Sequence, residues 1–146
     1  MDIEETAKEL DQIQISHPQA MAQIADALSV NGEAGVLIWL KQRREETFAI
    51  DITQHFGLTA GRVANIIRKL EEKGFLERKT HFEDQRKSQI VFTEKGLLYA
   101  ESLHQKMNKN HNLLLESLGE ENAAQAAKFL KHLIISLENN KDFKNI

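Results

Sequence analysis

Three polar residues of kinds that contact nucleic acids recur at helical spacing near the middle of the chain. Arg62, Asn65 and Lys69 stand at positions i, i+3 and i+7, so an α-helix would carry them on one face. In the major groove of DNA, arginine pairs with guanine and asparagine with adenine. Arg68 lies beside this face, and the hydroxyl of Thr59 suits both a helix cap and a phosphate. A solvated polar face is the alternative, but Arg62 and Asn65 fall in the first two turns, which favours base contact.

A second group of charged residues follows in a short loop. Asp84, Arg86 and Lys87 lie between two runs of alternating residues, 75–80 and 88–92, which predict a β-hairpin. An extended arginine at a hairpin tip fits the narrow, electronegative minor groove of DNA. Asp84 precedes Arg86 by two residues, where it can hold the arginine or the loop backbone. A plain surface hairpin is the alternative.

A helix-turn-helix is the element that would position the first group. Gly57 provides the left-handed turn, Leu58 plugs it, and the small Thr53 lets two helices cross closely. This predicts a second helix over residues 60–73, stopped by Gly74. The positions that should face the core are apolar: Ile52, Phe56, Val63, Ile66, Ile67 and Leu70. The spacing therefore favours a helix-turn-helix over a chance pair of helices.

Apolar residues at helical spacing predict three helices ahead of this unit, over residues 3–15, 18–28 and 33–44. Ser16 is the expected cap of the second helix and Asn31 that of the third. The third helix is apolar nearly all round, which predicts a central core helix.

Residues 47–50 have two interpretations. They form either a short strand that completes a small sheet or the start of the next helix, with Thr47 as its cap.

Two long helices are predicted after the hairpin. The first begins near Thr93 and ends at Gly119, and the second covers residues 120–139. The first carries a near-heptad stripe: Gly96, Ala100, Leu103, Met107, His111, Leu114 and Leu118. Together these helices have more apolar surface than a small DNA-reading unit can cover, which favours a homodimer interface. An intramolecular bundle with the first two helices is the alternative.

Charge and composition exclude several classes of protein. The chain has 146 residues and a net charge of −3, but residues 62–95 hold nine lysines and arginines against six acidic residues, a local balance of +3. Local charge decides phosphate contact. The absence of cysteine excludes disulfides, thiolate zinc sites and thiol redox switches. The start of the chain is acidic, unlike a signal peptide, and no apolar run would span a bilayer, so we expect a cytoplasmic protein without a membrane partner.

We expect neither enzymatic activity nor a cofactor. The sequence lacks a glycine-rich phosphate loop, a nucleophile elbow and a His-Glu-x-x-His helix. His104 and His111, with Glu101 or His132, have a spacing that would allow a metal site, but scattered histidines are usually surface residues, and we expect no metal.

Residues 33–119 resemble the MarR family of bacterial winged-helix regulators. The resemblance is strongest in Leu-Glu-Glu-Lys-Gly-Phe-Leu-Glu-Arg at 70–78, Asp-Gln-Arg at 84–86 and Phe-Thr-Glu-Lys-Gly at 92–96. It implies a mainly α fold with a small β-wing: N-terminal helices for dimerisation (1–30), a winged helix-turn-helix (31–95) and long C-terminal dimerisation helices (96–146).

By this resemblance, the protein would be a homodimeric transcriptional regulator of palindromic double-stranded DNA, usually a repressor released by a small-molecule effector. Residues 59–73 would be the recognition helix, and Arg86 the arginine of the minor groove. The chain departs from the family pattern at Gly61, which replaces a polar base reader, at Pro18, which breaks the first helix, and in having no cysteine for peroxide sensing. A winged-helix module that binds a protein and no DNA is the alternative, because the overall charge is acidic.

Effectors of the family bind between the dimerisation helices and the DNA-reading lobe. By analogy, His17, Met21, Trp39 and His111 would line such a pocket. Each also has a plainer interpretation: Trp39 and Met21 as core residues, His17 as a helix-start residue and His111 as an interface histidine.

Overall fold

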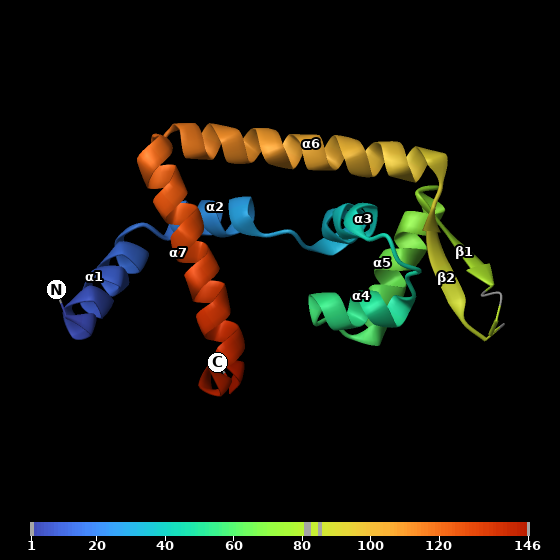
Figure 1. Ribbon diagram of the computed structural model, residues 1–146, viewed down its shortest axis with the longest axis horizontal. Helices are drawn as coiled ribbons and strands as arrows, with labels where there is room; N and C mark the ends of the chain where they lie inside the picture. The colour runs from blue at the N-terminus through green and yellow to red at the C-terminus, as the bar shows by residue number, and fades with distance from the viewer. Residues whose placement is uncertain (1, 81–82, 85, 146) are drawn as a thin grey trace. The chain divides into compact units, whose positions relative to one another are not determined.

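The computed structural model describes residues 2–80, 83–84 and 86–145, and this part of the chain is mainly helical with a small sheet (Figure 1). The chain divides into two compact units, Met1–Gln105 and Lys106–Ile146. The elements are α1 Ile3–Ser16, α2 Pro18–Leu28, α3 Gly32–Gln42, α4 Ala49–Phe56, α5 Ala60–Glu72, β1 Leu76–Thr80, β2 Ser88–Phe92, α6 Glu94–Glu116, α7 Glu120–Asn139 and the short 3-10 helix η1 Lys141–Asn145. The order α4, α5, β1, β2 is a winged helix-turn-helix, so the predicted fold class is confirmed.

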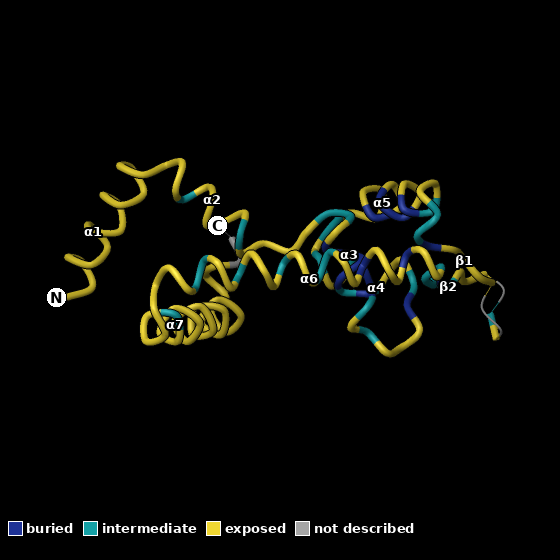
Figure 2. The backbone as a smooth tube through the Cα atoms, turned by 90° about the horizontal axis from the view of Figure 1, so that it is seen from above, coloured by how far each residue is buried: buried dark blue, intermediate teal, exposed yellow. Residues whose placement is uncertain are grey.

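The core of the first unit is built from α3, α4, α5, the hairpin and the start of α6. Its large side chains that are fully buried are Val36, Leu37, Ile52, Val63, Ile67, Leu70 and Leu76. Figure 2 shows them as dark stretches of the backbone in this part of the chain. The predicted central helix is confirmed as α3, which ends at Gln42, two residues earlier than expected.

The helix-turn-helix forms from local signals. Gly57 has φ +63° and ends α4 in the left-handed conformation that favours glycine. The Thr59 hydroxyl accepts a hydrogen bond of 3.2 Å from the Arg62 N–H, which confirms Thr59 as the cap of α5. Beyond α5, Gly74 has φ +77° and turns the chain into the wing.

Residues 47–50 contain both a short bridge to the sheet and the start of the next helix, so each of the two interpretations is correct in part. Phe48 makes an isolated bridge to Gln89 of the wing, and α4 begins at the next residue. Thr47 is not its cap: Phe48 occupies that position, and its N–H donates to the Asp51 carboxylate at 2.8 Å. The Thr47 hydroxyl instead accepts from the Arg43 side chain at 2.9 Å, because Thr47 is turned into the buried space beside β2.

The N-terminal helices also differ from prediction at their junction. Ser16 is the last residue of α1 and not the cap of α2, which is His17. The His17 N–H donates to the Ile13 carbonyl at 3.0 Å and so keeps Ser16 within α1. Pro18 then starts α2, as its fixed φ and missing N–H favour in a first helical turn.

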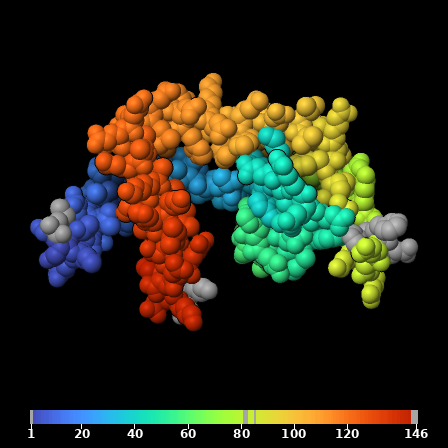
Figure 3. Space-filling model, viewed as in Figure 1, coloured from blue at the N-terminus to red at the C-terminus, as the bar shows by residue number. Residues whose placement is uncertain are grey.

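The wing is an antiparallel pair in which Leu76 opposes Phe92 and Thr80 opposes Ser88. Figure 3 shows it, in yellow-green, projecting from the compact helical cluster of the first unit. Gln85 of the Asp-Gln-Arg motif lies outside the described residues.

The second unit holds the end of α6, α7 and η1. Gly119, predicted to cap the first long helix, occupies the N-cap position of α7, because α6 ends earlier, at Glu116. The apolar side chains of α7 are exposed in the single chain: Phe129, Leu130, Leu133, Ile134, Ile135 and Leu137.

Candidate nucleic-acid interface

The helix α5 has one buried apolar face and one exposed polar face. Val63, Ile66, Ile67 and Leu70 are buried, whereas the candidate DNA-contact residues on the opposite side, Arg62, Asn65, Arg68 and Lys69, are exposed. Because the buried residues lock the rotation of the helix about its axis, the polar set points outward as a group. The predicted amphipathic division of this helix is confirmed.

Within the polar face, the side chains have different surroundings. Arg68 donates to the Asn65 side-chain oxygen at 2.7 Å and to the Glu72 carboxylate at 2.6 Å. Arg62 and Lys69 have no hydrogen-bond or ion-pair partner for their side chains in the described part of the chain. These two cations are therefore available to a ligand without breaking an internal contact.

The wing loop is organised by Asp84. One oxygen of its carboxylate accepts from the Arg86 backbone N–H at 3.0 Å and from the Arg86 Nε at 3.3 Å. The Asp84 carbonyl accepts from the Lys87 N–H at 3.0 Å. Arg86 nonetheless keeps its side chain 92% exposed. Asp84 thus holds both the loop backbone and the base of an arginine that projects into solvent.

A cavity of about 320 Å³ lies between the inner face of the wing and the start of α4. Its lining comes from both elements: Phe48, Ala49, Ile50, Arg78, Arg86, Lys87, Ser88 and Ile90. Three cations therefore line one space, and two of them, Arg78 and Arg86, are also paired with carboxylates. The Lys87 ammonium also lies 5.7 Å from the centre of the Phe48 ring.

Arg78 belongs to this cationic set, and the sequence reasoning did not include it. Its guanidinium is paired with Glu71 of α5 at 2.7 Å. Arg78 opposes the buried Ile90 in the hairpin and lies two residues after the buried Leu76, so it is on the inner face of the sheet. That alternation was visible in the sequence and was the signal that would have identified it.

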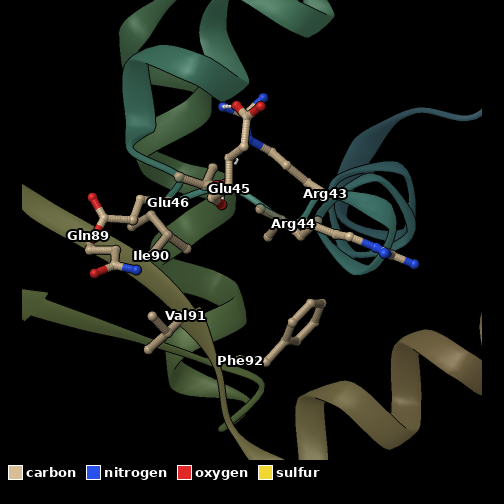
Figure 4. A pocket seen from close by; sticks show the side chains of 10 residues that line it. Arg43, Arg44, Glu45, Glu46, Gln89, Ile90, Val91 and Phe92 are labelled. Carbon is tan, nitrogen blue, oxygen red and sulfur yellow. Dashed lines mark hydrogen bonds and ion pairs between the residues drawn. The ribbon is translucent and has the colours of Figure 1, made fainter.

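A second cavity of about 320 Å³ lies between the connection after α3 and the strand β2 (Figure 4). Its lining is Leu40, Arg43, Arg44, Glu45, Glu46, Thr47, Gln89, Ile90, Val91 and Phe92. Arg43 is held in place on several sides, 4.9 Å from the centre of the Trp39 ring and 3.4 Å from the Glu45 carboxylate. The contacts of Arg43 tie this connection to α3.

The four predicted effector residues line neither of the two cavities described above. Trp39 stacks on His55 at 4.4 Å and meets Phe56 edge-on at 5.8 Å, which agrees with its plainer interpretation as a packing residue. His17 is exposed at the start of α2, Met21 is half-buried in the same helix, and His111 lies in the second unit. The effector site therefore stays a prediction.

The end of α5 is tied to α3 and α6. Lys73 pairs with Glu33 at 2.8 Å, and this hydrogen bond raises the pKa of the Lys73 ammonium above its ordinary 10.5, with a smaller Coulombic contribution from Glu33. The Lys95 ammonium donates to the Lys73 carbonyl at 2.9 Å. The helix α5 is thus anchored at the end opposite to Arg62.

The described residues contain no group of three histidine, cysteine, aspartate or glutamate side chains that could hold a metal ion. Nor does any helix described for this chain have the length and apolar character to cross a membrane.

Residues 31–88 match the model of the MarR family. A search of curated proteins gave no match. Among solved structures, the chain is similar to MepR of Staphylococcus aureus in complex with DNA, with a TM-score of 0.63 and 22% identity over 90% of this chain and 97% of that one. It is also similar to apo MarR of E. coli, with a TM-score of 0.61 and 16% identity over 91% and 97%. At such identities the similarity shows a common fold.

Proposed function

We propose that this chain, whose residues 31–88 match the model of the MarR family, is a sequence-specific, DNA-binding transcriptional regulator that binds a palindromic operator as a homodimer. The observation that carries this proposal is the outward polar face of α5 together with the exposed Arg86 of the wing. A helix of this kind enters the major groove, and a wing arginine fits the adjacent minor groove. DNA is bound by MepR in the similar solved complex.

The cavity beneath the wing supports a third contact, to the phosphate backbone of DNA between the major-groove and minor-groove contacts. Arg78, Arg86 and Lys87 surround it together with the start of α4. A DNA phosphate has the charge and size for such a place, and phosphate contacts fix the register of a protein on the duplex. On this proposal, Thr59, Arg62, Asn65, Arg68 and Lys69 face the major groove, and the wing residues, held by Asp84, face the backbone and minor groove.

The exposed apolar face of α7 supports the homodimer. Six large apolar side chains on one helix exceed what a soluble surface usually leaves uncovered. A second copy would cover them under two-fold symmetry, and the same symmetry would place two recognition helices on the two halves of a palindrome.

Repression and its relief by a small amphiphilic effector complete the proposal. They are based on the family resemblance, in which effectors bind between the dimerisation helices and the DNA-reading lobe. His17, Met21, Trp39 and His111 are the residues with which to begin a search for such a ligand.

Selection of bound duplexes from a random pool, followed by gel-shift titration, tests the function. Arg86→Ala should weaken binding to all duplexes, by about tenfold or more, because it removes a minor-groove contact, whereas Asn65→Ala should mainly relax base preference. Arg44→Ala is the matched control, since it removes an exposed arginine outside the proposed interface. Affinity should also fall steeply as salt rises.

Two results would contradict the proposal. If neither Arg86→Ala nor Asn65→Ala changes binding relative to Arg44→Ala, the assigned contacts are wrong. If the protein shows no salt-dependent duplex binding but forms a stable complex with another protein, it is the protein-binding winged-helix module instead.

A further inference from the structure

The side chain of Asn65 is already engaged within α5. An asparagine recognises adenine by accepting from its N6 amine with Oδ1 and donating to its N7 with Nδ2. Here the Asn65 Oδ1 already accepts from Arg68 at 2.7 Å, and Arg68 is held on its other side by Glu72 at 2.6 Å. Adenine would therefore have to share this oxygen with the Arg68 guanidinium, whereas the amide nitrogen of Asn65 has no such competitor.

We propose that the chain of contacts Asn65–Arg68–Glu72 makes the middle of α5 a donor-only surface that selects guanine in place of adenine. This inference rests on the proposed DNA-binding function. It changes the base that Asn65 is expected to read.

The orientation of the amide follows from chemistry. A guanidinium group has N–H donors and no acceptor, so the Asn65 atom that contacts it must be the oxygen. The amide nitrogen, with two donors, then points away from Arg68. Glu72 fixes the guanidinium by a charge-assisted hydrogen bond, and the spacings of three and four residues let both contacts form on one helix.

Guanine is the base that matches such a surface. Its major-groove edge presents two adjacent acceptors, N7 and O6, whereas adenine presents an acceptor beside a donor and cytosine presents only a donor. Two of the five N–H donors of Arg68 are used internally, so others remain for the same base or a neighbouring phosphate.

Gly61 gives a base edge access to this surface. It lies one turn before Asn65 on the same stripe of α5, and a Cβ built at Gly61 meets nothing within 4 Å. No neighbouring group in the protein requires a glycine at this position of the helix. A base edge that approaches from outside would require one, because the missing side chain leaves the Asn65 amide accessible.

Selection from a random duplex pool with four proteins tests the inference. Asn65→Ala identifies the operator position that Asn65 reads, since only that preference should disappear. The wild type should select guanine there. Arg68→Ala releases the Asn65 oxygen, so the ratio of adenine to guanine at that position should rise by about fivefold or more. Lys69→Ala removes an adjacent cation without touching the amide, so it should lower affinity and leave the base ranking unchanged.

Two outcomes overturn the inference while leaving the proposed function intact: the wild type selects adenine at the Asn65 position, or Arg68→Ala and Lys69→Ala lower affinity equally with the same base ranking as the wild type. Absence of any duplex selection by the wild type would remove the proposed function and this inference together. Circular dichroism of the exposed variants verifies that α5 remains folded.

Discussion

Gly96 is the residue on which the junction of wing and α6 depends most. It is buried at the start of α6, against the backbone of Phe75. A Cβ at Gly96 would overlap the Phe75 carbonyl oxygen, far inside van der Waals contact. Backbone atoms cannot yield as the end of a flexible side chain can. The helix and the chain that leaves α5 therefore approach more closely than any other residue would allow.

Gly96→Ala should accordingly destabilise the protein by about 1–3 kcal/mol, the usual range for overpacking a core. Gly61→Ala is the matched control, because that position in α5 is open and alanine favours helix. It should leave stability unchanged or raise it by up to about 1 kcal/mol. Urea unfolding of both variants measures the contrast. Equal stabilities would show that the close approach at Phe75 is absent in solution.

Lys73 provides a prediction about pH. Its hydrogen bond to Glu33 raises the pKa of the ammonium, so the folded state holds this proton more tightly than the unfolded state does. The resulting stabilisation is fully present below the ordinary value of 10.5 and is lost as pH rises through the higher folded-state pKa. Glu33→Gln should lower the pKa of Lys73 toward its ordinary value. An NMR titration of the Lys73 side chain measures it, and an unchanged pKa in Glu33→Gln would contradict the pairing.

Among the elements, α5 shows how a recognition helix is positioned. Its buried stripe sets the rotation about its own axis, and Thr59 and Gly74 set where it begins and ends. The contacts of Lys73 and Lys95 then attach its last turn to α3 and α6. These polar contacts to α3 and α6 are both at the C-terminal end of α5. The N-terminal turns, which would meet the bases, are therefore held in position by the anchored C-terminal end.

The start of α6 is joined to the end of α5 through one hydroxyl. The Thr93 Oγ1 donates to the Gly74 carbonyl at 2.6 Å and accepts from the Gly96 N–H at 2.9 Å. The same hydroxyl therefore caps the N-terminus of α6 and provides a hydrogen-bond donor for the Gly74 carbonyl in the turn after α5. The turn that follows α5 and the start of α6 therefore share this group.

Thr93→Ala removes both hydrogen bonds and should cost about 1–2 kcal/mol, the upper part of the range for a lost cap. Thr93→Ser keeps the hydroxyl and should recover most of that loss. Thermal and urea unfolding measure the two variants against the wild type. If serine and alanine were equally destabilising, the methyl group of Thr93 would matter and its hydroxyl would not.

On the scale of the whole molecule, the second unit offers little core of its own. No residue of α7 is buried in the single chain, although the helix is rich in leucine and isoleucine. Burial of that apolar surface is the main favourable contribution available to it. Self-association is the route to burial that also fits a two-fold symmetric operator.

Leu133→Glu should therefore weaken self-association by about tenfold or more, because it places a charge in an apolar interface. Lys131→Glu alters charge on the same helix at a polar position and should have a smaller effect. Sedimentation at several protein concentrations gives the dissociation constants. A wild-type protein that stays monomeric throughout the range would contradict the dimer.

The sequence by itself determined those features that depend on neighbours along the chain. The apolar period of α5, the left-handed turn at Gly57 and the cap at Thr59 follow from steric and hydrogen-bonding preferences over a few residues, and all three were predicted correctly. Boundaries were less accurate where local groups compete. Ser16 was expected to cap α2 and Thr47 was one candidate cap of α4, but His17 and Phe48 occupy those positions.

The tertiary structure alone decided which partners these residues meet. The pairing of Arg78 with Glu71 needs the wing folded against α5, and the contact of Gly96 with Phe75 needs two distant backbones to meet. Even Arg68, whose partners are within four residues, had several acceptors in reach by spacing alone. The physical reason is that sequence spacing defines which contacts are possible, whereas the packed positions of backbone and side chains select among them.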